Sequence, residues 1–312
     1  DPHWRAGAEH TAAFDIFSAG ILLFELATGQ RLYRAKSRKD KLQQVCAAEI
    51  PRPRDANPAI PVRLEEILLK GGQMMGVVNV VGSTIARTCG RGTYVHAGPE
   101  VAVASTKAFT SQVTALLLFT LMLARTKNLS VEEGRKVAKG LQELPATVNR
   151  YLQNPGPIEE AVERLINARY ALFLGRGLSF PVALEGALKL KEVAYVPCEA
   201  YPAGEMKHGP IAMIGDDTPV VAIVPNDSQR DKAISNLKEV EARGAKLIIV
   251  HTEGDKELEA LATVSLPIPK CPWWCAPVVT AVPLQLLAYH AGVALGCDID
   301  KPRNLAKSVT VE

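Results

Sequence analysis

The sequence predicts an α/β protein with a mainly parallel β-sheet, because short apolar strands alternate with longer helical segments from about residue 71 onward. The clearest example is TPVVAIV, DKAISNLKEVEARG and KLIIVH, a strand, a helix and a strand in succession. A second is YALFLG at 170–175, a strand that leads into the helical segment PVALEGALKLKEVAYV. We therefore expect residues 151–290 to form a complete α/β unit, with ligands at the carboxyl ends of its strands.

Composition argues against several classes of partner. The 312 residues include 36 Lys and Arg against 33 Asp and Glu, so no charged field favours nucleic acid or an anionic membrane. The longest apolar stretch, 113–124, is shorter than the roughly 20 residues of a spanning helix and predicts a buried core helix. The chain begins at Asp1 without the pattern of a secretory signal.

Cysteine usage indicates a reduced, cytoplasmic protein. Six cysteines are scattered through a long chain rather than grouped as a disulfide framework. Cys271 and Cys275 are close together, but no second pair of Cys or His stands near them at zinc spacing. We expect ordinary thiols and no metal site.

The first 70 residues differ in sequence pattern from the rest. Residues 12–29 predict a buried helix that ends at Gly29, and a basic run and a proline-rich loop follow. DIFSAGILLFELATG resembles the D-x-x-S-x-G helix in the C-lobe of Ser/Thr protein kinases. The glycine-rich loop, H-R-D loop and D-F-G site that phosphoryl transfer needs are missing. Residues 1–70 are therefore predicted to be a helical, kinase-like fragment without kinase activity.

Two features around the 170–175 strand are candidates for a role in binding or catalysis. The turn 175–177 (GRG) joins this strand to a helix, so its backbone suits either an anion or simply a tight turn. On that helix Glu185, Lys189 and Glu192 are spaced by four and three residues, which sets them on one face. A carboxylate beside an ammonium on an apolar helix suits a general base, and the alternative is a surface ion pair.

Two later segments also contain candidate residues. His208 lies in the Gly- and Pro-rich loop CEAYPAGEMKHGP, where it would be either a proton shuttle or a solvated side chain. Lys307 lies in the polar tail RNLAKSVTVE, which is alternatively a frayed terminus.

The order of seven segments strengthens the functional interpretation. They are VVGSTIAR, HAGPEVAVASTKAFTSQ, ALFLGRG, ALEGALKLKE, EAYPAGEMKHGP, TAVPLQLLAYH and PRNLAKSVTVE. Together they make residues 71–312 resemble the C-terminal sugar-isomerase half of the glutamine:fructose-6-phosphate amidotransferases. The resemblance implies parallel-sheet sugar-isomerase (SIS) domains, a truncated one at 71–150 and a complete one at 151–295, followed by an active-site tail at 296–312.

The resemblance also implies an activity and a set of site residues. Enzymes of this family aminate fructose 6-phosphate and isomerise the product to glucosamine 6-phosphate, for the biosynthesis of amino sugars such as UDP-N-acetylglucosamine. By match of motif, Glu192 is the base, His208 opens the sugar ring from the partner subunit of a homodimer, and Lys307 contacts the open-chain carbonyl. The matching substrate contacts are Val103, Ser105, Glu185, Lys189 and Ala306. No metal or organic cofactor is implied.

Two parts of the family pattern are missing from this sequence. One is the glutaminase domain with its N-terminal cysteine, so we expect no release of ammonia from glutamine. The other is a pair of Ser/Thr-rich loops that bind the phosphate, so we expect weak phosphosugar binding and impaired turnover. A regulatory module that binds phosphosugars without turnover is the alternative. Glu192, His208 and Lys307 favour the enzyme, because a sensor needs no base.

Overall fold

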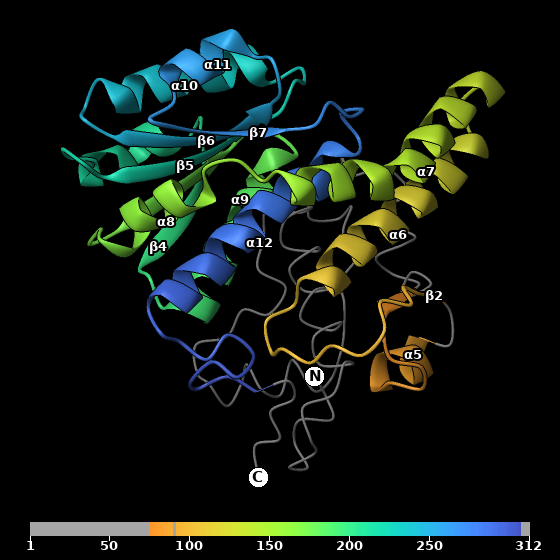
Figure 1. Cartoon of the computed structure of the whole chain (residues 1–312). Helices are drawn as coiled ribbons and strands as arrows, with labels where there is room; N and C mark the ends of the chain where they lie inside the picture. The colour runs from red at the N-terminus through yellow and green to blue at the C-terminus, as the bar shows by residue number, and fades with distance from the viewer. Residues whose placement is uncertain (1–74, 90–91, 307–312) are drawn as a thin grey trace, which may run out of the picture. The chain divides into compact units, whose positions relative to one another are not determined.

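The structure is a computed structural model that describes residues 75–89 and 92–306 (Figure 1). The predicted kinase-like segment 1–70, with its helix at 12–29, and Lys307 lie outside these residues. The chain divides into two compact units. One includes the described residues up to His96, and the other runs from Ala97 to Lys307.

The first unit contains two short parallel strands and one helix. Strand β1 (Gly76–Val78) pairs with β2 (Gly92–Tyr94), and helix α5 (Thr84–Cys89) lies between them in sequence. The strand predicted at 74–81 is present, but β1 is only three residues long.

The second unit is built on a sheet of five parallel strands. Their order in the sheet is β4-β3-β5-β6-β7, and every neighbouring pair is parallel. The strands are β3 (Ala171–Gly175), β4 (Cys198–Pro202), β5 (Pro219–Val224), β6 (Lys246–Thr252) and β7 (Val264–Ile268). The parallel α/β fold predicted for this region is confirmed.

Helices cover both faces of this sheet (Figure 1). Successive strand residues point to opposite faces, so Val221 belongs to one buried cluster and Ala222 to the other. The first face is covered by α8 (Ile158–Ile166), α9 (Ser179–Ala194) and α12 (Ala276–Ala294). The second is covered by α10 (Arg230–Glu241) and α11 (Lys256–Leu261).

Helix α7 (Val131–Gln153) begins with a capping box in which Ser130 and Glu133 bond each other's backbone N–H groups. It continues past residue 150, where the sequence predicts a domain boundary. The helix ends only at Gln153, with Asn154 as its C-cap, and the next two residues, Pro155 and Gly156, disfavour helix. The division into two SIS domains stays a prediction.

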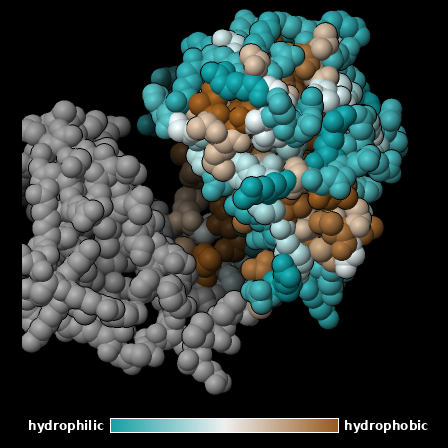
Figure 2. Space-filling model, turned by 90° about the vertical axis from the view of Figure 1, so that its left-hand side faces the viewer, coloured by the Kyte–Doolittle hydropathy of each residue, from teal (hydrophilic) through white to brown (hydrophobic). Residues whose placement is uncertain are grey.

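Helix α6 (Lys107–Arg125) corrects one expectation. Its apolar run predicted a core helix, but only Ala108 is buried. Val113 and Leu117 pack against the larger of the two buried clusters, the one on the sheet face covered by α8, α9 and α12. Leu116 and Met122 are about half exposed. Apolar composition does not determine what covers the outer side of a helix, and the described residues leave this side open. Exposed apolar residues also appear as brown patches on the face in Figure 2.

Helices α6 and α12 are each long and apolar enough to cross a membrane by length and composition. Core helices pass the same test, and most of α12 is buried. Its residues Val278, Val279 and Leu287 lie in the larger core cluster.

Candidate functional site

Helix α9 carries the three charged residues that the sequence grouped together. Its apolar residues, such as Val182 and Leu190, are buried in the core. Its close packing on α12 depends on Gly186, because a Cβ there would lie 2.6 Å from Leu284 Cδ1.

Glu185, Lys189 and Glu192 form one cluster, as their spacing predicts. The Lys189 ammonium donates a hydrogen bond to Glu192 Oε2 at 2.6 Å and lies 3.5 Å from Glu185 Oε1. The Lys189 side chain is only 4% exposed, so this is not the surface ion pair of the alternative interpretation. A buried ammonium requires a partner, and Glu192 provides the closest one.

The charges of this cluster leave one carboxylate in excess. Burial raises the pKa of Glu185, and the nearby Lys189 ammonium opposes that effect. Glu192 is held by Lys189 while its side chain stays 24% exposed. A fixed, accessible carboxylate is able to accept a proton from a bound molecule.

The structure brings two further predicted segments to the end of α9. Ala104, between the predicted contacts Val103 and Ser105, lies in one buried cluster with Val193, and Ile299 of the tail packs against it. The Val103 N–H also donates to the Asp300 carbonyl oxygen at 2.9 Å. The segment 103–105, the neighbour of Glu192 and the tail are therefore in contact.

Gly292 of α12 permits this approach. A Cβ at this position would lie 2.9 Å from Val193 Cγ1 and 3.0 Å from Ile299 Cγ2. The tail then turns at Asp298, whose Oδ1 accepts from the N–H groups of Asp300 and Lys301. No sequence motif indicated the role of Gly292. Ala306, the last described residue, is exposed.

His208 does not join Glu192 within the same chain. It ends the 3-10 helix η2 (Met206–His208), which follows β4, and its side chain is 76% exposed. Strand β4 begins soon after the end of α9, and its five residues carry the chain about 17 Å away. The neighbouring Lys207 pairs with Glu239 on α10, which covers the opposite face of the sheet from α9.

The turn 175–177 also lies apart from Glu192. A Cβ at Gly175 would lie 2.2 Å from the Ser179 carbonyl oxygen, so the tight turn requires glycine. Arg176 donates to the amide oxygens of Gln229 and Asn236, at 3.1 and 3.4 Å. The turn is at the start of α9, about 20 Å along the helix from Glu192. These contacts favour the tight-turn interpretation over the anion site.

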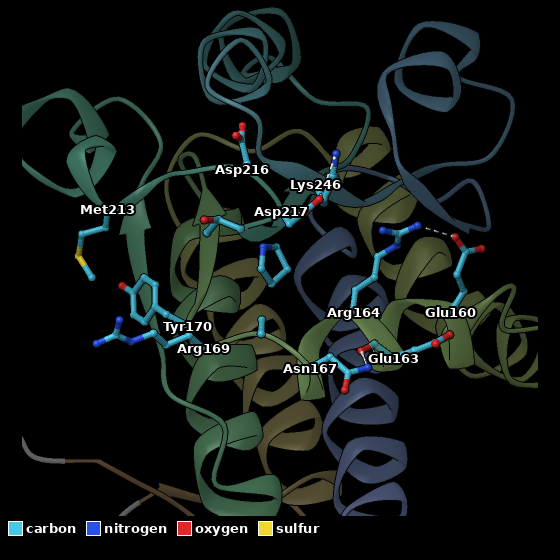
Figure 3. A pocket seen from close by; sticks show the side chains of 13 residues that line it. Glu160, Glu163, Arg164, Asn167, Arg169, Tyr170, Met213, Asp216, Asp217 and Lys246 are labelled. Atoms are coloured by element: carbon cyan, nitrogen blue, oxygen red, sulfur yellow. Dashed lines mark hydrogen bonds and ion pairs between the residues drawn. The ribbon is translucent and has the colours of Figure 1, made fainter.

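A cavity of about 600 Å³ opens at the amino ends of β5 and β6 (Figure 3). No sequence motif marks its lining residues, so this cavity could not be predicted from the sequence. Four of its charged side chains form two ion pairs, Arg164 with Glu160 at 3.4 Å and Lys246 with Asp217 at 3.3 Å. None of the predicted site residues lines it.

Metal-binding groups are not gathered in the part of the chain that the structure describes. No group of three or more His, Cys, Asp or Glu residues there is placed to hold an ion. The described cysteines are free, and burial raises the pKa of Cys198 and of Cys271 to about 11. Both are therefore neutral thiols near pH 7.

Comparison with known proteins identifies the α/β unit. The SIS domain family matches residues 164–295. Glutamine–fructose-6-phosphate aminotransferase [isomerizing] of Chlorobaculum tepidum is 50% identical over 243 residues, 78% of this chain and 40% of that protein. Its counterpart in Thermus thermophilus is 46% identical over 250 residues, 80% of this chain and 41% of that protein.

A solved structure agrees. The C-terminal domain of glucosamine-fructose-6-phosphate aminotransferase from Francisella tularensis superposes with a TM-score of 0.70 and 43% identity, covering 73% of this chain and 65% of that one. These matches give no support to the kinase resemblance of residues 10–70. The chain spans about two fifths of the length of these curated relatives, and its residues 164–295 are a SIS domain.

Proposed function

We propose that this chain is the isomerase part of a glutamine:fructose-6-phosphate aminotransferase, which combines a phosphorylated ketose with ammonia, releases water, and isomerises the aminated ketose to the amino-aldose. One observation carries the proposal: Glu192 is hydrogen-bonded to the buried Lys189 beside the two segments that match the family's sugar contacts. Isomerisation moves a proton between neighbouring carbons and needs a positioned base. The substrates that we propose are fructose 6-phosphate and glucosamine 6-phosphate.

The residue roles follow from the same cluster. Glu192 abstracts the proton, and Lys189 orients its carboxylate through their hydrogen bond. Glu185 supports Lys189 from the preceding turn of α9. Val103, Ser105 and Ala306 contact the sugar, and Lys307 meets the open-chain carbonyl.

The position of His208 supports a homodimer. This side chain is exposed and lies away from Glu192 of its own chain, which suits a group that enters the site of a second copy. In a two-fold dimer both sites would be completed in the same way. The cytoplasmic location expected from cysteine usage belongs to the same proposal.

The test is the incorporation of solvent deuterium into glucosamine 6-phosphate in D₂O, because the label accumulates even when turnover is slow. We expect incorporation by the 312-residue chain and a loss of about 100-fold or more in Glu192→Gln, which removes the base. Lys136→Met, at an exposed ion pair on α7, is the matched control and should keep the wild-type rate. Binding of the sugar without incorporation would instead indicate a regulatory module.

A further inference from the structure

Tyr195 ends α9 in a backbone conformation that tyrosine rarely adopts. Its φ and ψ are 57° and 20°, in the left-handed region. Glycine is the usual residue at such a helix end, and a bulky side chain is disfavoured there. An unfavourable conformation of this kind persists where the surroundings require that particular residue. We therefore expect contacts of the Tyr195 side chain to account for this conformation.

Both contacts are with one residue of the C-terminal tail. The Arg303 N–H donates to the Tyr195 hydroxyl oxygen at 2.7 Å. The Arg303 guanidinium lies over the Tyr195 ring, 4.2 Å from its centroid, which is a cation–π contact. The tyrosine thus fixes the backbone and the side chain of Arg303 together.

The tail has a second attachment nearby. Asp300 accepts the Val103 N–H, and Ile299 packs against the cluster that contains Val193. Tyr195 is three residues after Glu192, and Arg303 is three residues before Ala306. The two attachments therefore join the tail to α9 and to the 103–105 segment. They lie close in sequence to Glu192 on α9 and to Ala306 in the tail.

We propose that Tyr195 is a positioning residue for the isomerisation: it holds the tail so that Ala306 is presented to the end of α9 that carries Glu192. The catalytic part of this inference rests on the proposed function. The anchoring part does not, because it concerns only the order of the tail.

Hydrogen exchange of the Arg303 amide in the full chain, followed by NMR, tests the anchoring. Tyr195→Phe keeps the ring and removes the acceptor, so we expect exchange at Arg303 to become about tenfold faster while α9 amides are unchanged. Tyr201→Phe is the matched control, because its hydroxyl bonds Glu199 instead of the tail, and it should leave Arg303 unchanged. Unchanged exchange at Arg303 in Tyr195→Phe would overturn the proposal.

Tyr195→Gly tests the positioning. Glycine suits the left-handed helix end, so α9 keeps its termination while both contacts with Arg303 are lost. We expect kcat for glucosamine 6-phosphate to fall by about tenfold or more with KM within about twofold, since the lost order affects the reacting geometry. An unchanged kcat would refute the positioning role. If the wild-type chain shows no turnover, the proposed function fails, and exchange at Arg303 alone decides whether Tyr195 anchors the tail.

Discussion

The ammonium of Lys189, almost completely buried, lies 2.6 Å from Oε2 of Glu192. Burying an ammonium without a compensating carboxylate is costly. The same hydrogen bond holds the Glu192 carboxylate in one orientation. The pair therefore links the stability of α9 to the chemistry proposed for Glu192, and both are open to measurement.

Removing the ammonium should destabilise the fold. Lys189→Met leaves Glu185 and Glu192 facing each other without a compensating charge, and we expect the free energy of unfolding at pH 7 to fall by about 3 kcal/mol. Lys136→Met, at an exposed pair with Glu132, should change it by less than about 0.5 kcal/mol. Urea denaturation of both variants measures the difference. Equal effects would show that burial of Lys189 carries no special weight.

Glu185 predicts a pH dependence of stability with a definite sign. Its pKa in the fold lies above the ordinary value of 4.5, chiefly because of burial. The folded chain then binds more protons than the unfolded chain between these two values, so this group lowers stability as pH rises through that window. Relative to the wild type, the free energy of unfolding of Glu185→Gln should therefore be higher at pH 7 than at pH 4. Urea titrations at the two pH values measure this difference.

The matched control for this pH dependence has the opposite sign. Hydrogen bonds from Ser130 lower the pKa of Glu133 below 4.5. Its stabilising contribution is present above 4.5 and is lost as pH falls through the lowered value. Relative to the wild type, the free energy of unfolding of Glu133→Gln should therefore be lower at pH 7 than at pH 3. The same direction of change in both variants would contradict the assignment.

Gly292 is the close contact on which the tail depends. Gly292→Ala sets a methyl group against Val193 and Ile299, at 2.9 and 3.0 Å, and should cost about 1–3 kcal/mol of stability as an overpacked site. Gly215→Ala adds the same methyl group where no atom lies within 4 Å and should change stability by less than about 0.5 kcal/mol. Thermal unfolding compares them, and a null result at Gly292 would mean that the tail shifts without cost.

The sequence predicted the parts of the site that depend on local spacing. Glu185, Lys189 and Glu192 meet because a helix brings residues three and four apart to one face. The pairing of Tyr195 with Arg303 spans 108 residues of sequence, and no local pattern reports such a contact. The same limit explains α6, since its apolar residues predict burial and only the tertiary arrangement determines what covers them.

Mixing two inactive variants tests whether His208 acts in the site of a second chain. Glu192→Gln and His208→Asn chains are each expected to lose activity, because each lacks one proposed group. In a mixed dimer one site combines both changes, while the other combines an intact Glu192 with an intact His208. Equal mixing makes half of the dimers mixed, so about a quarter of the wild-type deuterium incorporation should return. A His208 that served its own chain would leave every site defective, and mixing would restore nothing. The exposure of this side chain, 76%, and its separation from α9 by the length of β4 favour the first outcome.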